Sequence, residues 1–456
     1  MAARPLLWAS AAVAAVAAAV MTSTALPVVA APRTDQAGGT RSVKVVDVVR
    51  KGSRVVELTI RTPAFATPTK VDVDLPVGYR SHPHKRWPVT YFLAGIMNTY
   101  ASLNHVVDGV KLTSHFPAIS VSPNGDSGWW SDWYNSGAGG APEYETYVVD
   151  QLIPLIDKRF RTIPRRSERA VIGVSMGGYG AMMLAARHPD LFGEAASLSG
   201  AVNTSFQPIA TVLSASPTFQ GGAVDAIYGS QATQEIRWHG HNPTDLASNL
   251  RETRLQVRTA NGFPNPGIGE TLLSADTPSC LIEAGVHQGS LDFTRKLNAL
   301  HIPHLWEDYG PGCHTPQNFE REITDTLSVL AKQFADPAAQ PSSFTYRSIE
   351  PRFGIYGWHV AADPRRALEF LELHVTGHRH LMLAGSGTTT ITTPRWFSGG
   401  RRVVLRGAMQ RQAPVDRRGR ATFTVDLGAP DRNQQYTAGA TTSTVRRTVA
   451  IAPSRE

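Results

Sequence analysis

The chain has 456 residues, of which 42% are hydrophobic and 18% are charged. This balance is typical of a globular protein and excludes a disordered chain, and the length predicts about two or three domains. The net charge is +8, but it is unevenly distributed. Residues 344–456 hold 17 Arg, no Lys and 8 acidic residues, so the rest of the chain is close to neutral.

The N-terminus has the pattern of a secretory signal peptide over residues 1–30. Arg4 supplies positive charge, an apolar run covers residues 5–20, and small residues at 28–30 form a cleavage site before Ala31. The alternative is an uncleaved membrane anchor, because the apolar run is long for a signal peptide. No later stretch has the roughly 18 apolar residues of a spanning helix. We therefore expect an exported protein, secreted or at the cell envelope, with no transmembrane span in its mature form.

The cysteine count agrees with an oxidising compartment. Cys280 and Cys313 are the two cysteines, and in an exported protein they predict one disulfide. The three His-x-His pairs, at 82/84, 239/241 and 378/380, lie outside any Cys/His cluster with metal spacing. We expect neither a metal nor a cofactor.

After a polar lead-in at residues 31–42, the hydrophobic pattern predicts one large α/β domain over residues 43–335. Three strand-like runs separated by turn residues predict an antiparallel start. Short apolar strands then alternate with helices, which predicts a largely parallel sheet covered on both faces. The expected strands are residues 43–49, 55–60, 71–75, 89–93, 118–121, 170–174, 195–198, 255–259 and 306–309, and the expected helices are 144–160, 177–188, 245–249 and 290–300.

The last part of the chain changes in character. Residues 336–343 are Pro- and Ser-containing and are the expected linker. Beyond them, Thr/Val-rich runs and Gly-rich turns predict a basic, β-rich, sandwich-like accessory domain over residues 344–456, with one helix near 364–373. Its Arg excess is explained either by scattered solvated Arg or by attachment to an anionic envelope polymer or lipid surface. A nucleic-acid partner is not expected, because the protein is exported and has no nucleic-acid module.

The strongest local motif runs from Gly173 to Gly178, with Ser175 at its centre. It follows the expected strand 170–174 and opens the expected helix 177–188, which is the setting of a nucleophile elbow. Small residues are needed on both sides of such a serine, and the helix N-terminus favours developing negative charge. The motif therefore predicts Ser175 as a nucleophile.

A serine nucleophile needs a base, and the base should follow the last strand of the sheet. His314 fits, because it lies in a Gly-rich loop directly after the expected strand 306–309. The rivals, His287 and His301, lie in or beside an expected helix.

The remaining parts of such a site are an acid and an oxyanion hole. The acid should lie between the serine and the histidine, and spacing alone leaves Glu283, Asp276 and Asp292 open. One oxyanion N–H belongs to Met176, the residue after the nucleophile, and the other should come from the loop at residues 94–97.

Taken together, residues 43–335 resemble the antigen 85 mycolyltransferases, within the wider esterase D branch of the α/β-hydrolases. Motifs occur in the order of that family at 123–125 with 131–134, 144–146, 173–177, 242–244, 253–255 with 260–262, and 312–314. The resemblance implies the α/β-hydrolase fold and a triad of Ser175, Glu283 and His314, with Asp276 as the second choice for the acid. It also places the second oxyanion N–H at Ile96.

The chain departs from this family in the oxyanion loop. The family usually has Asp, Gly, an apolar residue and Arg there, whereas this chain has Ala94, Gly95, Ile96 and Met97. The missing polar pair lies near the sugar acceptor in the family, so the resemblance does not by itself imply trehalose as the acceptor, and water, trehalose, glycerol or another alcohol stay open. Because the implied fold brings the two cysteine segments to the active site, we hypothesise that the disulfide ties the acid and base loops together.

These observations give a first functional hypothesis and two rivals. The first is a secreted serine esterase or acyltransferase that moves an acyl group, mycolyl or another long acyl by resemblance, from a lipid or glycolipid ester to water or an alcohol. The rival from another class is a non-catalytic envelope-binding or adhesion protein on a hydrolase fold. A peptidase is less favoured, because no sequence feature provides a peptide-specific pocket.

Overall fold

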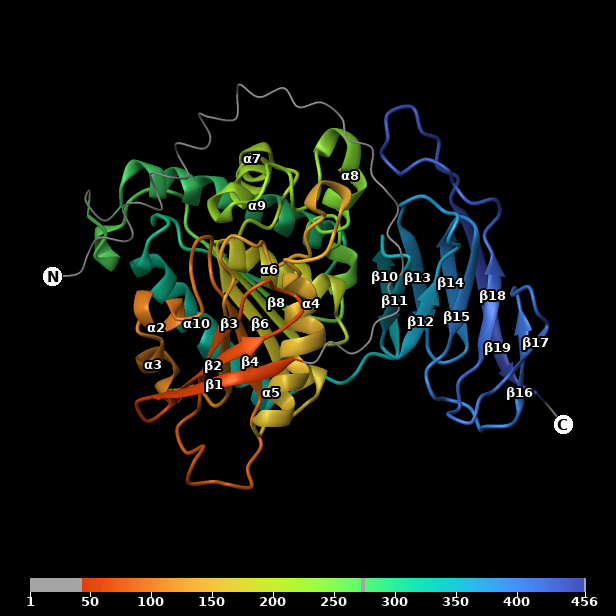
Figure 1. Ribbon diagram of the computed structural model, residues 1–456, viewed down its shortest axis with the longest axis horizontal. Helices are drawn as coiled ribbons and strands as arrows, with labels where there is room; N and C mark the ends of the chain where they lie inside the picture. The colour runs from red at the N-terminus through yellow and green to blue at the C-terminus, as the bar shows by residue number, and fades with distance from the viewer. Residues whose placement is uncertain (1–42, 272–274, 455–456) are drawn as a thin grey trace.

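The computed structural model describes residues 43–271 and 275–454. The expected signal peptide and lead-in, residues 1–42, lie outside the described residues. The described chain forms a large sheet covered by helices and, beside it, a region made of strands (Figure 1).

The large sheet has nine strands in the order β1-β2-β3-β5-β4-β6-β7-β8-β9. The pairs β1–β2, β2–β3 and β3–β5 are antiparallel, and the remaining neighbours are parallel. The bounds are β1 Lys44–Lys51, β2 Val55–Arg61, β3 Thr69–Asp74, β4 Val89–Leu93, β5 Ile119–Pro123, β6 Arg169–Val174, β7 Glu194–Leu198, β8 Arg254–Thr259 and β9 His304–Asp308. This strand order, with its β3-β5-β4-β6 crossover, is the α/β-hydrolase fold that the sequence predicted.

Helices cover both faces of this sheet (Figure 1). Successive side chains of a strand point to opposite faces, and β6 buries both sets: Val171 joins one core cluster, while Ala170 and Ile172 join the other. The helices are α2 Ser102–Val106, α3 Gly109–Leu112, α4 Tyr144–Thr146, α5 Ile153–Arg159, α6 Met176–Arg187, α7 Gln207–Ala215, α8 Gln231–His239, α9 Thr277–Ala299 and α10 Pro316–Ala335. A π-helical segment, Tyr147–Leu152, joins α4 to α5, so the expected helix 144–160 is continuous but not regular.

Three sequence expectations differ from the structure. The expected helix 290–300 is only the second half of α9, which begins at Thr277. The expected helix 245–249 is reduced to a 3-10 turn at Ala247–Leu250. The expected helix 364–373 is wrong, because strand β13, Leu371–Thr376, occupies its end. The i,i+3 pair of Arg366 and Glu369 imitates a helical ion pair, but Leu371, Leu373 and Val375 alternate into a β core.

The β-rich region holds two antiparallel sheets with a shared hydrophobic core that includes Trp358, Leu373 and Phe423. One sheet has the order β10-β13-β14-β19-β16-β17 and the other β11-β12-β15-β18. The bounds are β10 Ser343–Ser348, β11 Arg352–Ile355, β12 Trp358–Ala361, β13 Leu371–Thr376, β14 His380–Gly385, β15 Thr388–Thr392, β16 Arg402–Arg406, β17 Gln412–Pro414, β18 Thr422–Asp426 and β19 Val445–Pro453. The two sheets therefore form a sandwich with its own core.

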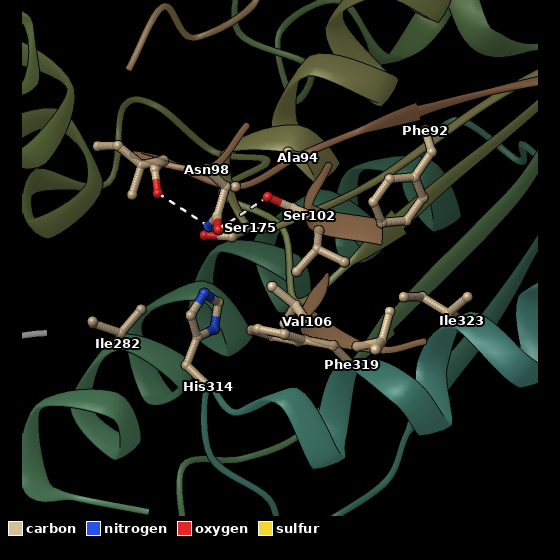
Figure 2. A pocket seen from close by; sticks show the side chains of 14 residues that line it. Phe92, Ala94, Asn98, Ser102, Val106, Ser175, Ile282, His314, Phe319 and Ile323 are labelled. Atoms are coloured by element: carbon tan, nitrogen blue, oxygen red, sulfur yellow. Dashed lines mark hydrogen bonds between the residues drawn. The ribbon is translucent and has the colours of Figure 1, made fainter. Parts of the chain in front are cut away.

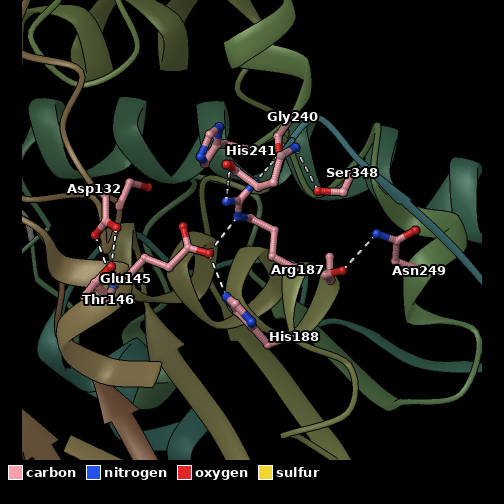
Figure 3. A network of polar contacts seen from close by, with 12 residues as sticks. Asp132, Glu145, Thr146, Arg187, His188, Gly240, His241, Asn249 and Ser348 are labelled. Carbon is pink, nitrogen blue, oxygen red and sulfur yellow. Dashed lines mark hydrogen bonds and ion pairs between the residues drawn. The ribbon is translucent and has the colours of Figure 1, made fainter. Parts of the chain in front are cut away.

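This sandwich docks against the C-terminal end of α6. The Tyr346 hydroxyl donates to the Arg187 carbonyl at 2.7 Å, and the amide of Asn249 exchanges two 2.9 Å hydrogen bonds with the backbone of Arg347. Arg187 also bridges the two parts, since it pairs with Glu145 at 2.7 Å (Figure 3) and with Glu350 of the sandwich region at 2.9 Å. The sandwich is therefore packed onto the hydrolase part through specific contacts.

Candidate active site

Ser175 lies at the turn between β6 and α6, in a conformation that L-residues rarely adopt. Its φ is 60° and its ψ is −121°. A Cβ at position 177 would collide with the Leu93 carbonyl oxygen, and one at position 173 with the backbone of Gly177. Glycine is therefore required on both sides, and the strained turn lifts the serine hydroxyl off the end of the sheet.

His314 follows β9 and contacts the acid implied by the family resemblance. Its Nδ1 lies 2.7 Å from Oε2 of Glu283, whose side chain is fully buried. The ring of Phe319 packs edge-on against the imidazole, with ring centres 4.9 Å apart. The contact of Nδ1 with Glu283 fixes the tautomer of His314 in which Nε2 is free to accept a proton.

Ser175 and His314 face one cavity from opposite sides (Figure 2). The side chains of Ser175 and His314, both among the described residues, are not hydrogen-bonded to each other in the structure. Such contacts are often long without substrate and shorten when it binds, so the arrangement fits a nucleophile and its base.

The other candidate acids and bases are engaged elsewhere. Asp276 caps the N-terminus of α9 by accepting from the Ser279 N–H at 2.8 Å. Asp292 accepts from Asn203 and pairs with Arg295. His287 contacts Asp308 at 3.0 Å.

The two cysteines form a disulfide, Cys280–Cys313, with their Cα atoms 4.4 Å apart. Cys280 lies one helical turn before Glu283 on α9, and Cys313 precedes His314. The His314 N–H also donates to the Ser279 carbonyl at 3.1 Å. The helix that carries Glu283 and the loop that carries His314 are thus joined by the disulfide and by this backbone hydrogen bond, in addition to the contact between the two side chains.

A further carboxylate, which the sequence did not reveal, holds the same loop. The buried Glu270 accepts the Cys313 N–H at 2.9 Å, the Thr315 hydroxyl at 2.6 Å and the Asn265 N–H at 2.7 Å. It fixes the backbone on both sides of His314. No sequence signal identifies it, because it is an isolated Glu in a Gly- and Pro-containing loop.

Two backbone N–H groups near Ser175 fit an oxyanion hole. Within the described part of the chain, neither the Ile96 nor the Met176 N–H has an acceptor. The loop that carries Ile96 is fixed by hydrogen bonds from Met97 N–H to the Asp126 carbonyl at 2.8 Å and from Asn98 N–H to the Gly95 carbonyl at 3.2 Å. Unpaired donors in a fixed loop can stabilise an oxyanion without reorganising.

The cavity beside Ser175 is small and mainly apolar. Its volume is about 130 Å³. Its walls come from β4, β6, the loop at residues 94–97, α2, α9 and α10, and they include Phe92, Ala94, Gly95, Ile96, Asn98, Ser102, Val106, Val107, Val174, Ile282, Phe319 and Ile323. An apolar cavity that opens at a serine hydroxyl fits the acyl part of an ester.

Comparison with known proteins identifies the family of the chain. The sequence profile of the Esterase family matches residues 62–327, which is more than half of the chain. The chain belongs to this esterase family. Ester hydrolysis or acyl transfer is the chemistry that this membership supports.

Two curated relatives illustrate the membership. Esterase Rv1288 of Mycobacterium tuberculosis is 29% identical over 307 residues, which cover 65% of this chain and 64% of that protein. The diacylglycerol acyltransferase/mycolyltransferase Ag85B of Mycobacterium leprae is 31% identical over 187 residues, covering 40% of this chain and 55% of that protein. The chain therefore matches less than two thirds of these relatives' lengths. The predicted relation to the antigen 85 group is confirmed.

Among solved structures, MPT51 of Mycobacterium tuberculosis aligns with 61% of this chain and 97% of its own, at 19% identity and a TM-score of 0.49. In residues 43–271 and 275–454, no helix is both long and apolar enough to cross a membrane.

Proposed function

We propose that this protein is an exported serine esterase or O-acyltransferase that works through an acyl-enzyme on Ser175. The observation that carries the proposal is the 2.7 Å contact between Glu283 and His314, on the far side of the apolar cavity from Ser175. In this scheme Ser175 is the nucleophile, His314 the general base and acid, and Glu283 the group that orients the imidazole and stabilises its charged form.

The reaction has two halves. Ser175 Oγ attacks the ester carbonyl carbon while His314 Nε2 takes the hydroxyl proton, and the oxyanion accepts hydrogen bonds from the Ile96 and Met176 N–H groups. The C–O bond to the leaving alcohol then breaks, and His314 gives that alcohol its proton. In the second half, water or another alcohol attacks the acyl-enzyme with His314 again as base, and Ser175 is released with its proton.

The cavity favours a short acyl group over a mycolyl chain. About 130 Å³ is well below the roughly 300–1,000 Å³ of typical ligand pockets. Ala94 and Met97 also stand where the antigen 85 group has polar residues near its sugar acceptor. We therefore favour a broad esterase, with acyl transfer to small alcohols as a side reaction.

For the sandwich, we propose attachment to an anionic polymer of the cell envelope through an Arg edge, defined as Arg395, Arg401, Arg402, Arg417 and Arg418. All five are exposed. Their two loops meet, because the Trp396 N–H donates to the Gly419 carbonyl and the Val415 N–H to the Arg401 carbonyl. Asp416 is the acid among them, and its side chain accepts the N–H groups of Arg418 and Arg420.

The attachment is tested on the full chain by retention on immobilised polyphosphate. Replacing the five residues of the Arg edge by Gln should release the protein at a lower salt concentration, because fewer phosphate charges are neutralised. A matched variant, R50Q/R80Q on the hydrolase part, should elute like the unaltered protein. Equal elution of all three proteins would contradict the attachment.

The catalytic proposal is tested with p-nitrophenyl esters of increasing acyl length, with and without glycerol or trehalose. We expect Ser175→Ala to lower kcat/KM by at least about 10³-fold and His314→Ala by about 10²–10⁴-fold, with hydrolysis fastest for short acyl groups. Ser398→Ala, an exposed serine of the sandwich, is the matched control.

The products separate the remaining alternatives. An acylated alcohol that appears with faster p-nitrophenol release would make acyl transfer the main reaction. Free acid alone would make the protein an esterase. Equal, negligible rates from the unaltered protein and Ser175→Ala would move the function to a non-catalytic binding protein.

A further inference from the structure

A second carboxyl group, outside the proposed triad, lies behind Glu283. Glu322, on α10, and Ser199, directly after β7, are both fully buried. The Ser199 hydroxyl lies 2.7 Å from Oε1 of Glu283 and 2.9 Å from Oε1 of Glu322. Ser199 holds this position with a φ of 45°, and its N–H donates to the Arg258 carbonyl at 2.8 Å. One hydroxyl therefore bridges two buried carboxyl groups.

The number of hydrogen atoms available for the two contacts of Ser199 indicates the protonation state of Glu283 and Glu322. A serine hydroxyl can donate one hydrogen bond, and an ionised carboxylate can only accept. If both carboxyl groups were ionised, one of the two contacts would place oxygen lone pairs against each other in a buried site. The Asn318 amide also donates to the Ser199 hydroxyl, at 3.3 Å, so it supplies no hydrogen to either carboxyl group. Both short contacts are satisfied when one carboxyl group carries a proton.

Glu283 is the carboxyl group whose surroundings favour the charged form. Its Oε1 also accepts the Ala260 N–H at 2.8 Å and the Thr259 hydroxyl at 2.9 Å, while Oε2 faces His314. Several donors that converge on one carboxylate stabilise its charge.

Glu322 has the opposite surroundings. Its Oε2 is buried without a hydrogen-bond partner, and within the described residues no cation pairs with it. The nearby cations are engaged elsewhere: Arg321 contacts Asn318 and the ring of Tyr309, and Arg258 contacts the Tyr309 hydroxyl. Burial, and then the charge of Glu283, raise the pKa of Glu322 well above its ordinary value, which Ser199, Arg321 and Arg258 offset only in part.

We propose that Glu322 is a neutral positioning residue whose O–H donates to the Ser199 hydroxyl, so that the hydrogen of Ser199 is directed to Glu283. The inference rests on the proposed function, because it assigns Glu283 as the acid that orients His314. The chain of donors holds Glu283 with Oε2 toward the imidazole. It also keeps one negative charge, rather than two, behind the base.

The kinetic test compares pH profiles of kcat/KM for a short p-nitrophenyl ester. Glu322→Gln keeps a donor for Ser199 without a charge, so we expect its acid limb to coincide with that of the unaltered protein. Glu322→Leu removes the donor and should lower kcat about tenfold, as for one lost hydrogen bond, with KM unchanged. Glu320→Gln, an exposed neighbour on α10, is the matched control and should change neither quantity.

The opposite protonation predicts a different profile. If Glu322 were ionised, Glu322→Gln would remove a negative charge near His314 and shift the acid limb down by about one pH unit. That shift would overturn the proposal. Equal kcat for Glu322→Leu and the unaltered protein would also overturn it, because the donor would then have no positioning role.

An infrared difference spectrum tests the protonation without turnover. The difference spectrum between the unaltered protein and Glu322→Gln should contain the band of one protonated carboxylic acid, apart from any protonated carboxyl group that both proteins share. The difference between the unaltered protein and Glu320→Gln should lack this band, and both results should hold when all three proteins carry Ser175→Ala. If this band is missing and Ser175→Ala is inactive, the neutral state of Glu322 is overturned while the proposed catalytic function stands. An active Ser175→Ala protein would overturn the proposed function and leave the band as evidence for the neutral carboxyl group.

Discussion

The two ends of helix α6 differ in how their polar groups are satisfied. At the N-terminal end, Ser175 has a strained backbone and lines the apolar cavity, and within the described residues the Met176 N–H has no acceptor. At the C-terminal end, Arg187 pairs with Glu145 and donates to the Gly240 carbonyl at 3.0 Å (Figure 3). Arg187 also pairs with Glu350, and the Tyr346 hydroxyl donates to the carbonyl of Arg187. One end leaves donors unpaired, and the other pairs its charges across two parts of the chain.

The difference shows how one helix serves both chemistry and assembly. Unpaired donors next to a strained serine cost stability, but they are available to a developing oxyanion. Paired charges at the other end hold the sandwich against the helix that carries Ser175, the proposed nucleophile. Changes at the docking end should therefore alter stability and spare turnover, whereas changes at the catalytic end should alter turnover.

The largest effect on stability is expected from Arg187→Ala at the docking end. Burial opposes ionisation of Glu145, but Arg187 and then His188 outweigh it and hold the pKa of that carboxyl below its ordinary value. Without Arg187, a buried carboxylate loses its main partner, which typically costs about 3–5 kcal/mol. We expect the free energy of unfolding, measured in urea, to fall by this amount, with kcat/KM of the folded protein retained.

The matched control at the same contact is Glu350→Gln. The Glu350 side chain is 39% exposed, and half-exposed ion pairs contribute about 0–1 kcal/mol. A loss in this variant as large as that of Arg187→Ala would show that the sandwich contact, rather than the buried Glu145 pair, is the source of the stability.

A somewhat smaller loss is expected at the catalytic end from the double variant Cys280→Ser/Cys313→Ser. The bridge spans 33 residues, and closing a loop of this length stabilises a protein by about 3–4 kcal/mol. In contrast to Arg187→Ala, kcat should also fall, because the bond joins the segments of Glu283 and His314. Unfolding in urea and esterase assays on the same samples separate the two effects, and an unchanged kcat would contradict the role of the bridge in holding the site.

The last expected effect depends on pH and arises at the start of β7, the strand that ends next to Ser199. Glu194 is 1% exposed, and in the described part of the chain neither of its oxygens has a hydrogen-bond partner, with Arg254 Nη1 3.6 Å from Oε1. Burial raises the pKa of Glu194 to about 8, against weaker opposition from Arg254 and Arg166. The folded state thus holds this proton more tightly than the unfolded chain, where the pKa is about 4.3. The stabilising contribution is complete below about pH 4 and is lost as pH rises toward about 8.

Glu194→Gln cannot lose such a proton. Its free energy of unfolding should therefore gain on that of the unaltered protein as pH rises from about 4 to about 8, while kcat/KM stays the same. Exposed Glu307→Gln should show no such gain. A constant difference between Glu194→Gln and the unaltered protein across this pH range would contradict a neutral Glu194.

The sequence predicts the parts of the site that depend on local structure. Ser175 was identified because the strand-turn-helix pattern and its glycines are consecutive in the chain. Spacing alone does not identify the proposed acid, because Glu283 reaches His314 through the packing of α9 against the loop after β9, and only the family resemblance selected it. Glu270 and Glu322 had no signal at all. Their partners, such as Cys313 and Ser199, lie 43 and 123 residues away.

The wrong expectation of a helix at residues 364–373 is also explained by contacts between residues far apart in the sequence. Its residues have the i,i+3 charge pair of a helix, but β13 pairs with β10 and β14, and this tertiary pairing overrides the local pattern.

The strand order of the six-stranded sheet determines how far the Arg edge lies from the hydrolase part that carries the cavity. The strand β10 lies at the docking edge and β17 at the opposite edge, beside the Arg edge (Figure 1). Strands in a sheet are about 4.8 Å apart, so five intervals separate the two edges by roughly 24 Å. Bound to a polymer through its Arg edge, the enzyme would hold its cavity at least that far from the polymer chain, and would act on esters that project from the polymer or diffuse past it.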